Sequence, residues 1–460
     1  MLFVKKILRL IPSIVLVCSL LPAKSQINSP FSRYGLGNEV FNSQNATSQA
    51  LGGFTAAYTS SMNGSFGQSL NFNNPASYAS LYMTTFDLGM NLTSNILRSQ
   101  SPVSKFNSNY FVPNYLAVGL PIDKKRKIGM AFGLRPITQI NYSIDELKTL
   151  SAGDSLFNNY IGQGGLNQAF FGAAKSWKRF SVGFNTGYNF GKKKINNIKS
   201  FVYNTDSTNY YQSIASTNTL FGGFFMQLGV LGDVTLKTVQ HKAATDKTEY
   251  TLSYGGTATL KQSLSGKQDV LRSTGSYTTG TETNLDTVSL VSNTAGKINL
   301  PAKYTAGIAF HKKEISNNGI FDQWVIGLEY DRANWKNNYS FYGQSDMLSD
   351  AYMTRLCVQF CPNALDFENY WSTVTYRAGF NTGKDYINID QNGLKVTSFS
   401  IGAGFPIRKY RSYDYQFSVL NMALQYGKRG SSLNSYQENF FQFTFGYSLS
   451  DIWFNKRKYD

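Results

Sequence analysis

The chain has few charged residues and almost no histidine. Charged side chains make up 15% of the 460 residues, where a soluble protein has about a quarter. A hydrolase commonly needs a histidine as proton acceptor, and only His241 and His311 are present. Both are expected in or beside turns, as solvated side chains without a neighbouring nucleophile. The sequence therefore argues against an enzyme and predicts no catalytic residue.

Ligand motifs for metals and phosphates are also missing. No His/Cys/Asp cluster has the spacing of a zinc site, and the GQGGLNQ segment at 162–168 lacks the Lys-Ser/Thr of a phosphate-binding loop. We therefore expect no metal and no cofactor.

Cysteine is scarce, and the two residues outside the N-terminal segment, Cys357 and Cys361, form C-x-x-x-C. Four residues along a strand span about 13 Å, whereas a disulfide needs Cα atoms about 4.4–6.8 Å apart. The pair can form only if the chain bends, which Pro362 favours. A disulfide and two free thiols both remain open.

Long apolar runs are absent except at the N-terminus. Residues 1–25 contain a basic start, an apolar stretch and the small-x-small sequence Ala23-Lys24-Ser25, which is typical of a secretory signal peptide. The apolar stretch is too short, and broken by Pro12, to span a membrane as a helix. Cys18 follows Val17, where a lipoprotein signal would have a small residue, so we interpret Cys18 as part of the apolar stretch.

Aromatic residues are abundant, with 30 Tyr and 34 Phe, although the mean hydropathy is only −0.27. They recur at every second position. In FFQFTFGYSLSDIWF at 440–454, large apolar residues alternate with Gln, Thr, Gly and Ser, and SVGFNTGYNF and SFSIGAGF show the same pattern. Alternate strand residues lie on opposite faces. An aromatic face opposite a small polar face is typical of a transmembrane β-barrel.

About fourteen such segments are present, which predicts an all-β, 14-stranded antiparallel transmembrane β-barrel over residues 80–460. Connections alternate between long (141–165, 192–218, 264–298) and short (121–127, 177–179, 406–413). Outer-membrane barrels have short periplasmic turns and longer external loops. We therefore expect a bacterial outer-membrane protein with a periplasmic C-terminus.

The short turns are basic, which predicts a positively charged periplasmic rim. It either contacts lipid phosphates or docks an acidic periplasmic protein. Nucleic acid is not expected as a partner in this compartment. The rim residues are Lys124, Lys125, Arg126, Lys127, Arg408, Lys409, Lys456, Arg457 and Lys458.

Residues 26–79 show no strand pattern and are rich in Gly, Ser, Asn and Ala. Fourteen strands enclose more space than wall side chains alone can fill. The segment is therefore either a disordered tail or an N-terminal plug (hatch) in the lumen. Its apolar residues, such as Leu51, Phe54 and Phe72, favour the plug.

Several segments resemble FadL-type outer-membrane proteins, the long-chain fatty acid transporter type. These are ALGGFTAAY (50–58), NNPASYASL (73–81), VGLP (118–121), GQGGLNQ (162–168), Pro301 with Tyr304 and Gly307, and Tyr330 with Asp331 and Trp335. The opening SPFSRYGLG and the closing WFNKRKYD resemble a Bacteroidota branch that includes a type IX secretion shuttle protein. The resemblance spans nearly all of the chain after residue 25.

The resemblance implies a plugged 14-stranded barrel, with Asn74, Pro75 and Ala76 at the junction between the hatch and the first strand. Family members carry hydrophobic compounds that leave sideways at a kinked third strand. Arg135 and Pro136 lie in the third predicted strand. Because proline donates no ladder hydrogen bond, Pro136 marks either a lateral gap or a strand end outside the bilayer.

Two functions follow as hypotheses. The first is hatch-gated, porin-like passive diffusion of hydrophobic or amphipathic small molecules across the outer membrane. The second is a non-transporting accessory or scaffold subunit of a barrel-assembly or type IX secretion machine, with periplasmic or outer-membrane protein partners. A solidly packed lumen favours the second hypothesis, and a connected apolar cavity favours the first.

Overall fold

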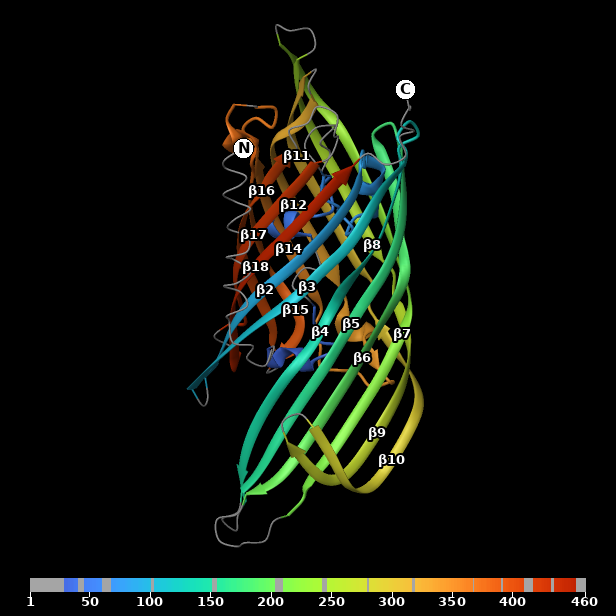
Figure 1. Ribbon diagram of the computed structural model, residues 1–460, viewed down its shortest axis with the longest axis vertical. Coiled ribbons are helices and arrows are strands. Elements are labelled where there is room, and N and C mark those ends of the chain that lie inside the picture. Colours follow the sequence, from blue (N-terminus) through green and yellow to red (C-terminus); the bar gives the residue numbers. More distant parts are fainter. Residues whose placement is uncertain are drawn as a thin grey trace, which may run out of the picture.

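The computed structural model describes residues 29–39, 45–59, 68–100, 103–150, 155–202, 210–241, 246–278, 281–316, 319–366, 368–389, 392–408, 417–431 and 434–451. The signal-peptide prediction for residues 1–25 lies outside these residues. Strands form a closed antiparallel wall around a small N-terminal segment (Figure 1). The strands are β2 (Thr84–Gln100), β3 (Val103–Asp123), β4 (Ile128–Thr149), β5 (Ser155–Trp177), β6 (Phe180–Val202), β7 (Gln212–Gln240), β8 (Lys247–Thr259), β9 (Gln262–Thr278), β10 (Thr281–Leu300), β11 (Lys303–Ser316), β12 (Gly319–Ala333), β14 (Ala351–Phe360), β15 (Thr375–Ile389), β16 (Asn392–Arg408), β17 (Phe417–Arg429) and β18 (Tyr436–Asp451).

The wall has fourteen positions because two of its strands are interrupted. Strands β8 and β9 pair with successive parts of β7 and together occupy one position in the wall. Strands β11 and β10 pair with β8 and β9, respectively, and together occupy the next position. The wall closes where β18 pairs with β2 along its whole length. The predicted 14-stranded antiparallel barrel is therefore confirmed.

The predicted long connections were wrong in extent. Residues 264–298 are almost entirely strands β9 and β10, and most of 141–165 and 192–218 continues β4 to β7. These strand ends extend beyond the other strands at the lower end of the barrel (Figure 1). The exposed apolar stripe weakens there while the hydrogen-bonded ladder continues, so alternation in the sequence does not reveal them.

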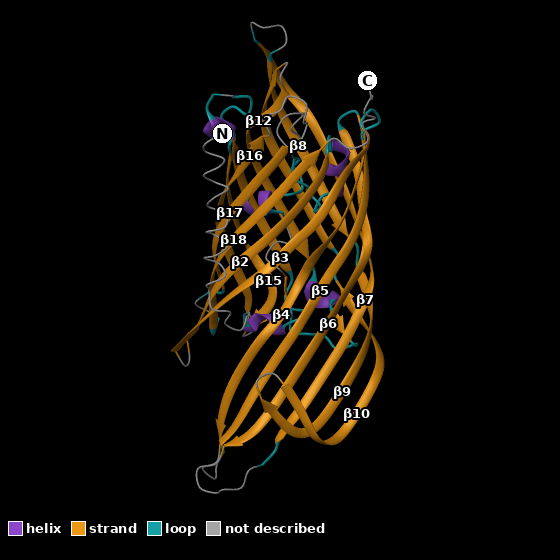
Figure 2. Cartoon of the chain, in the orientation of Figure 1, coloured by secondary structure: helices purple, strands orange, loops and turns teal. Residues whose placement is uncertain are grey.

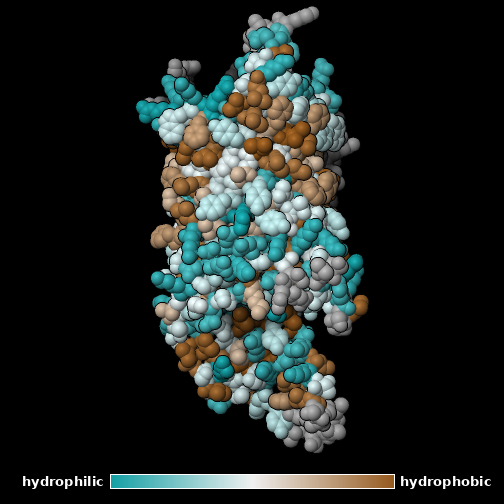
Figure 3. Space-filling view, turned by 180° about the vertical axis from the view of Figure 1, so that it is seen from behind, coloured by the Kyte–Doolittle hydropathy of each residue, from teal (hydrophilic) through white to brown (hydrophobic). Residues whose placement is uncertain are grey.

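Side chains alternate across the wall as predicted. On β18, Phe441 and Leu449 are exposed outward, while Gln442, Thr444 and Ser448 are buried inside. On the face seen in Figure 3, apolar patches lie in the upper part, a hydrophilic zone crosses the middle, and further apolar patches lie below it. The outward aromatics therefore form the lipid-facing surface of the barrel.

The N-terminal segment lies inside the barrel and forms a plug. Its elements are η1 (Pro30–Arg33), β1 (Asn38–Glu39), α2 (Ala46–Ala50) and η2 (Pro75–Ser80). Its large side chains Leu51, Phe54, Phe72 and Tyr78 are fully buried against the wall. Figure 2 shows these short elements enclosed by strands.

Three further short elements lie at the strand ends: α3 (Trp335–Asn338), β13 (Ser340–Phe341) and α4 (Tyr370–Thr373). No described helix is long and apolar enough to cross a membrane.

Candidate functional site

The predicted hatch junction lies where the plug meets β6 and β7. Asn74 caps η2 by accepting a hydrogen bond from the Ala76 backbone N–H at 3.1 Å. Its side-chain amide donates to the carbonyls of Ala56 at 2.5 Å and Val230 at 3.1 Å. Asn74 thus links two parts of the plug to the wall. Pro75 packs against Gly183 of β6. A Cβ at position 183 would lie 2.5 Å from the Pro75 carbonyl carbon, so only glycine leaves room for Pro75 there.

A buried carboxylate on β12 holds another turn of the plug. Glu329 accepts hydrogen bonds from the backbone N–H groups of Thr55 at 2.7 Å and Ala56 at 2.6 Å. Its second oxygen receives a hydrogen bond from Arg355 on β14 at 2.9 Å, and Arg355 also pairs with Asp331. The charge of this carboxylate is thereby matched by an arginine and two backbone donors, which offsets its desolvation.

Amide and hydroxyl side chains fasten the helical part of the plug to β15–β18. The Asn381 side chain donates to the Gly52 carbonyl and Ser400 donates to the Ala50 carbonyl, both at 3.1 Å. Gln49 donates to Gln425 and, at 3.2 Å, to Gln442. At Gly379 a Cβ would lie 2.1 Å from the Gly52 nitrogen. The plug therefore fits the wall closely on this side.

Charged side chains line the space that the plug leaves free. A cavity of about 260 Å³ lies in the lumen, and its lining includes Arg135, Lys303, Glu329, Asp331 and Arg355. A second buried cluster joins Arg429 to Asp385, to Glu438 at 3.5 Å and to the plug residue Asn38 at 3.2 Å. The lining of the cavity also contains apolar side chains such as Leu36, Leu166 and Leu300, so this cavity combines charged and apolar surface.

The seam between β3 and β4 is incomplete. The two strands pair only from Leu116 opposite Leu134 to Asp123 opposite Ile128. Beyond Leu134, β3 continues to pair with β2, and β4 continues to pair with β5. The β4–β5 pairing contains a register shift between Pro136 and Thr138. Pro136 therefore lies just past the last β3–β4 pair. Strand β4 continues to Thr149, so the interpretation of Pro136 as a strand end is wrong.

The plug covers part of the β4 edge that is not paired with β3. Strand β1 pairs there, with Asn38 opposite Gln139 and Glu39 opposite Thr138. The Thr138 hydroxyl donates to the Leu36 carbonyl at 2.6 Å. Gly37 has φ +100°, and a Cβ there would lie 2.5 Å from the Gln139 carbonyl oxygen, so only glycine fits this approach.

Arg135, predicted beside the gap, is buried and contacts the lumen instead of lipid. It donates to Asn73 of the plug at 2.6 Å and to Gln168 at 2.8 Å. Its guanidinium lies over the rings of Phe72 and Phe170, 5.1 and 5.6 Å from their centroids. Arg135 thus anchors the plug next to the incomplete seam.

The other predicted residues are separate from this site. Cys357 and Cys361 are both buried free thiols, so the disulfide that the sequence allowed is not formed. Burial raises the pKa of the Cys361 thiol to about 11. His241 is exposed as expected. His311 was expected to be solvated, which is wrong: it is buried on β11, with Nδ1 3.4 Å from Asp322 Oδ1.

The basic rim is partly described. Lys124, Lys125, Arg126 and Lys127 are exposed in the turn between β3 and β4. Arg408 ends β16, and Lys409, Lys456, Arg457 and Lys458 lie outside the described residues. The described residues contain no group of three or more His, Cys, Asp or Glu that could hold a metal.

Sequence reasoning missed the ionic clusters around Glu329 and Arg429. A signal was present, since charged residues at inward positions of membrane strands are costly and need partners. The partners come from other strands, however, and their identity depends on the strand register.

The BamG family model matches residues 3–460. No curated protein sequence matches the chain. Solved structures with the same fold include the following three. The Pseudomonas putida toluene transporter TodX has a TM-score of 0.53 and 13% identity over 90% of this chain and 99% of its own. The Ralstonia pickettii toluene transporter TbuX has a TM-score of 0.51 and 13% identity over 90% of this chain and 100% of its own. A Pseudomonas aeruginosa FadL homologue has a TM-score of 0.51 and 10% identity over 91% of this chain and 99% of its own. The chain therefore shares the fold of FadL-like β-barrels.

Proposed function

The chain belongs to the BamG family, and we propose that it is a non-transporting accessory subunit of an outer-membrane barrel-assembly machine. The family name points to such a machine. The observation that carries the proposal is the plug, whose backbone and side chains are bonded to β4, β7, β12 and β15–β18. A plug held in this way serves as a core for a rigid scaffold.

The lumen contains fixed charges that an apolar solute would have to pass. Its cavity of about 260 Å³ is lined by Arg135, Glu329 and Arg355, among other charged groups. Removing one partner of a buried ion pair costs about 3–5 kcal/mol, so a solute that separates such pairs meets a large barrier. This argues for a structural role and against hatch-gated diffusion through the centre. Catalysis has no part in the proposed role.

The proposed orientation places the short turns and the C-terminus in the periplasm. The exposed turn Lys124–Lys127 then faces this compartment and provides a docking rim for an acidic partner protein. The tall ends of β4–β7, β9 and β10 lie outside the cell in this orientation. Residues 1–25 act as the signal peptide and 26–79 as the plug domain.

Gentle detergent extraction of an epitope-tagged chain tests the proposal. We expect subunits of the barrel-assembly machine to co-purify in fixed ratio, and fewer of them with K124Q/K125Q/K127Q. The triple variant K192Q/K267Q/K297Q, at the opposite end, is the matched control. Co-purification of type IX secretion components would move the role to that machine, and migration as a lone barrel would contradict the proposal.

A second function, conduction of hydrophobic molecules, is favoured by the incomplete β3–β4 seam. The TodX and TbuX structures are named as toluene transporters. In this alternative a solute passes sideways between β3 and β4 after β1 leaves the edge of β4. Uptake of toluene into proteoliposomes tests it, with removal of residues 29–39 expected to raise the rate. No uptake by either form would exclude this alternative.

A further inference from the structure

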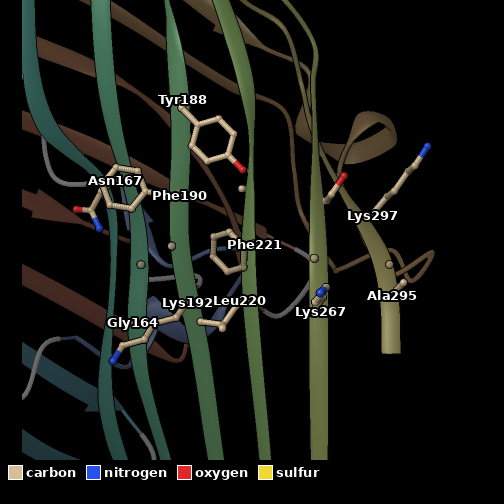
Figure 4. Close-up of a pocket in the computed structure, with 16 residues that line it drawn as sticks. Gly164, Asn167, Tyr188, Phe190, Lys192, Leu220, Phe221, Lys267, Ala295 and Lys297 are labelled. Atoms are coloured by element: carbon tan, nitrogen blue, oxygen red, sulfur yellow. The ribbon is translucent and has the colours of Figure 1, made fainter. Parts of the chain in front are cut away.

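A groove on the outer surface of the barrel combines aromatic and basic side chains. It has a volume of about 1140 Å³ and lies across β5, β6, β7, β9 and β10 (Figure 4). Tyr188, Phe190 and Leu220 form its apolar part, and Lys192, Lys267 and Lys297 its basic part. All six side chains are exposed.

Strand register brings the three lysines together. Lys192 on β6 is opposite Leu220 on β7, and Leu220 is opposite Lys267 on β9. Neighbouring strands lie about 4.8 Å apart, so the backbones of Lys192 and Lys267 are about 10 Å apart. Lys297 is opposite Ser265, two residues from Lys267. Three flexible ammonium groups can therefore reach one large anionic headgroup.

The floor of the groove consists of small residues, and its lining contains no acidic residue. Ser265 is opposite Gly222 on one side and Lys297 on the other, and Ala295 is opposite Lys267. Across the described residues, none of the ion pairs involves Lys192, Lys267 or Lys297. The nearby carboxylate of Asp269 accepts a hydrogen bond from the Asn293 backbone N–H at 2.8 Å. The groove is thus a cationic surface open to a ligand.

The groove lies at the lower edge of the lipid-facing surface. Along β6, the exposed residues Phe184, Tyr188 and Phe190 precede Lys192. A smaller groove of about 500 Å³ on β12, β14 and β15 has the same order, with Tyr330 followed by Arg332 and with Lys336 and Lys384 in its lining, although Asp350 there pairs with Arg332 at 4.0 Å. Aromatic residues mark the membrane interface, so the cations lie at headgroup depth.

We propose that the Lys192–Lys267–Lys297 groove binds the phosphate groups of a phosphorylated glycolipid in the outer leaflet. The lysines neutralise the phosphates, while Tyr188, Phe190 and Leu220 contact the start of the acyl chains. Free phosphate would use only the first of these contacts. The inference rests on the orientation in the proposed function, but it does not depend on a protein partner.

Native mass spectrometry of the purified full chain in mild detergent tests the inference. The probes are diphosphorylated lipid A, dephosphorylated lipid A and phosphatidylethanolamine. We expect only diphosphorylated lipid A to stay bound, and K192Q/K267Q/K297Q to weaken its binding at least tenfold. The variant K105Q/K148Q/K237Q removes the same charge at exposed positions outside the groove and should bind like the original chain.

Equal retention of all three lipids, or unchanged binding by K192Q/K267Q/K297Q, would overturn the proposal. Displacement of lipid A by low millimolar inorganic phosphate would also overturn it, because the site would then recognise a small anion. Loss of lipid binding in the triple variant with intact co-purification of protein partners separates this inference from the proposed function.

Discussion

Two seams of the same wall are built differently. Strands β5 and β6 pair without a register shift from Ser155 opposite Val202 to Trp177 opposite Phe180. The pairing of β3 with β4 stops at Leu134. At the β5–β6 seam, neighbouring wall strands pair with each other along their whole length. At the β3–β4 seam, the plug strand β1 pairs with part of the β4 edge that β3 leaves unpaired. The plug is therefore also a part of the wall.

The largest effect is expected from a proline in the fully paired part of β4. Ala131 pairs with Gly119 on one side and Gly172 on the other, so Ala131→Pro removes a ladder hydrogen bond at a closed position. We expect the heat-sensitive gel shift of a folded barrel to be largely lost. Pro136→Val, past the end of the β3–β4 pairing, should fold normally. Equal folding of both variants would show that the paired part of β4 and the part beyond its pairing with β3 tolerate proline equally.

A smaller loss is expected when the plug is released from β12. Arg355→Met leaves Glu329 and Asp331 buried without their arginine, at a cost of about 3–5 kcal/mol. The denaturant midpoint should fall and protease should cleave the plug. The double variant E329Q/R355M should recover part of the stability, because one uncompensated charge is removed. No recovery would mean that shape, and not charge, holds the plug here.

The smallest effect is expected at the incomplete seam. Thr138→Val removes the hydroxyl that donates to the Leu36 carbonyl and accepts from the Leu166 backbone N–H at 3.1 Å. Loss of the bond to Leu36 costs about 1 kcal/mol. Amide exchange of residues 37–39 should become faster by about fivefold. Thr186→Val removes a comparable hydroxyl bond, to the Phe225 carbonyl at 3.1 Å, on β6 and is the matched control. If both variants leave this exchange unchanged, β1 is held by its backbone pairing alone.

The sequence predicted the barrel because membrane strands repeat an apolar side chain at every second position. Phe441 and Leu449 show the pattern, and the structure has them facing outward. The ends of β9 and β10 could not be predicted in this way, because outside the membrane no lipid selects one apolar face. Asn74 could be assigned to the plug junction from its resemblance to a known family.

The ionic lumen could not be predicted in the same way. Glu329 and Arg355 are directly opposite across β12 and β14, but only the register shows that they meet. Which plug turn fills the space beside them depends on the three-dimensional path of residues 45–59. Similarly, Lys192, Lys267 and Lys297 come from three strands, and their chain positions give no sign that they share a groove.

The unequal height of the wall has a consequence for access from outside. Strand β7 has 29 residues, whereas β14 has 10 and β17 has 13. Strands β4–β7, β9 and β10 extend beyond the other strands on one side of the barrel mouth at its lower end (Figure 1). In the orientation proposed above, large molecules at the cell surface would reach the mouth across the shorter flank of β14–β18, which is where we expect a surface-exposed partner to approach.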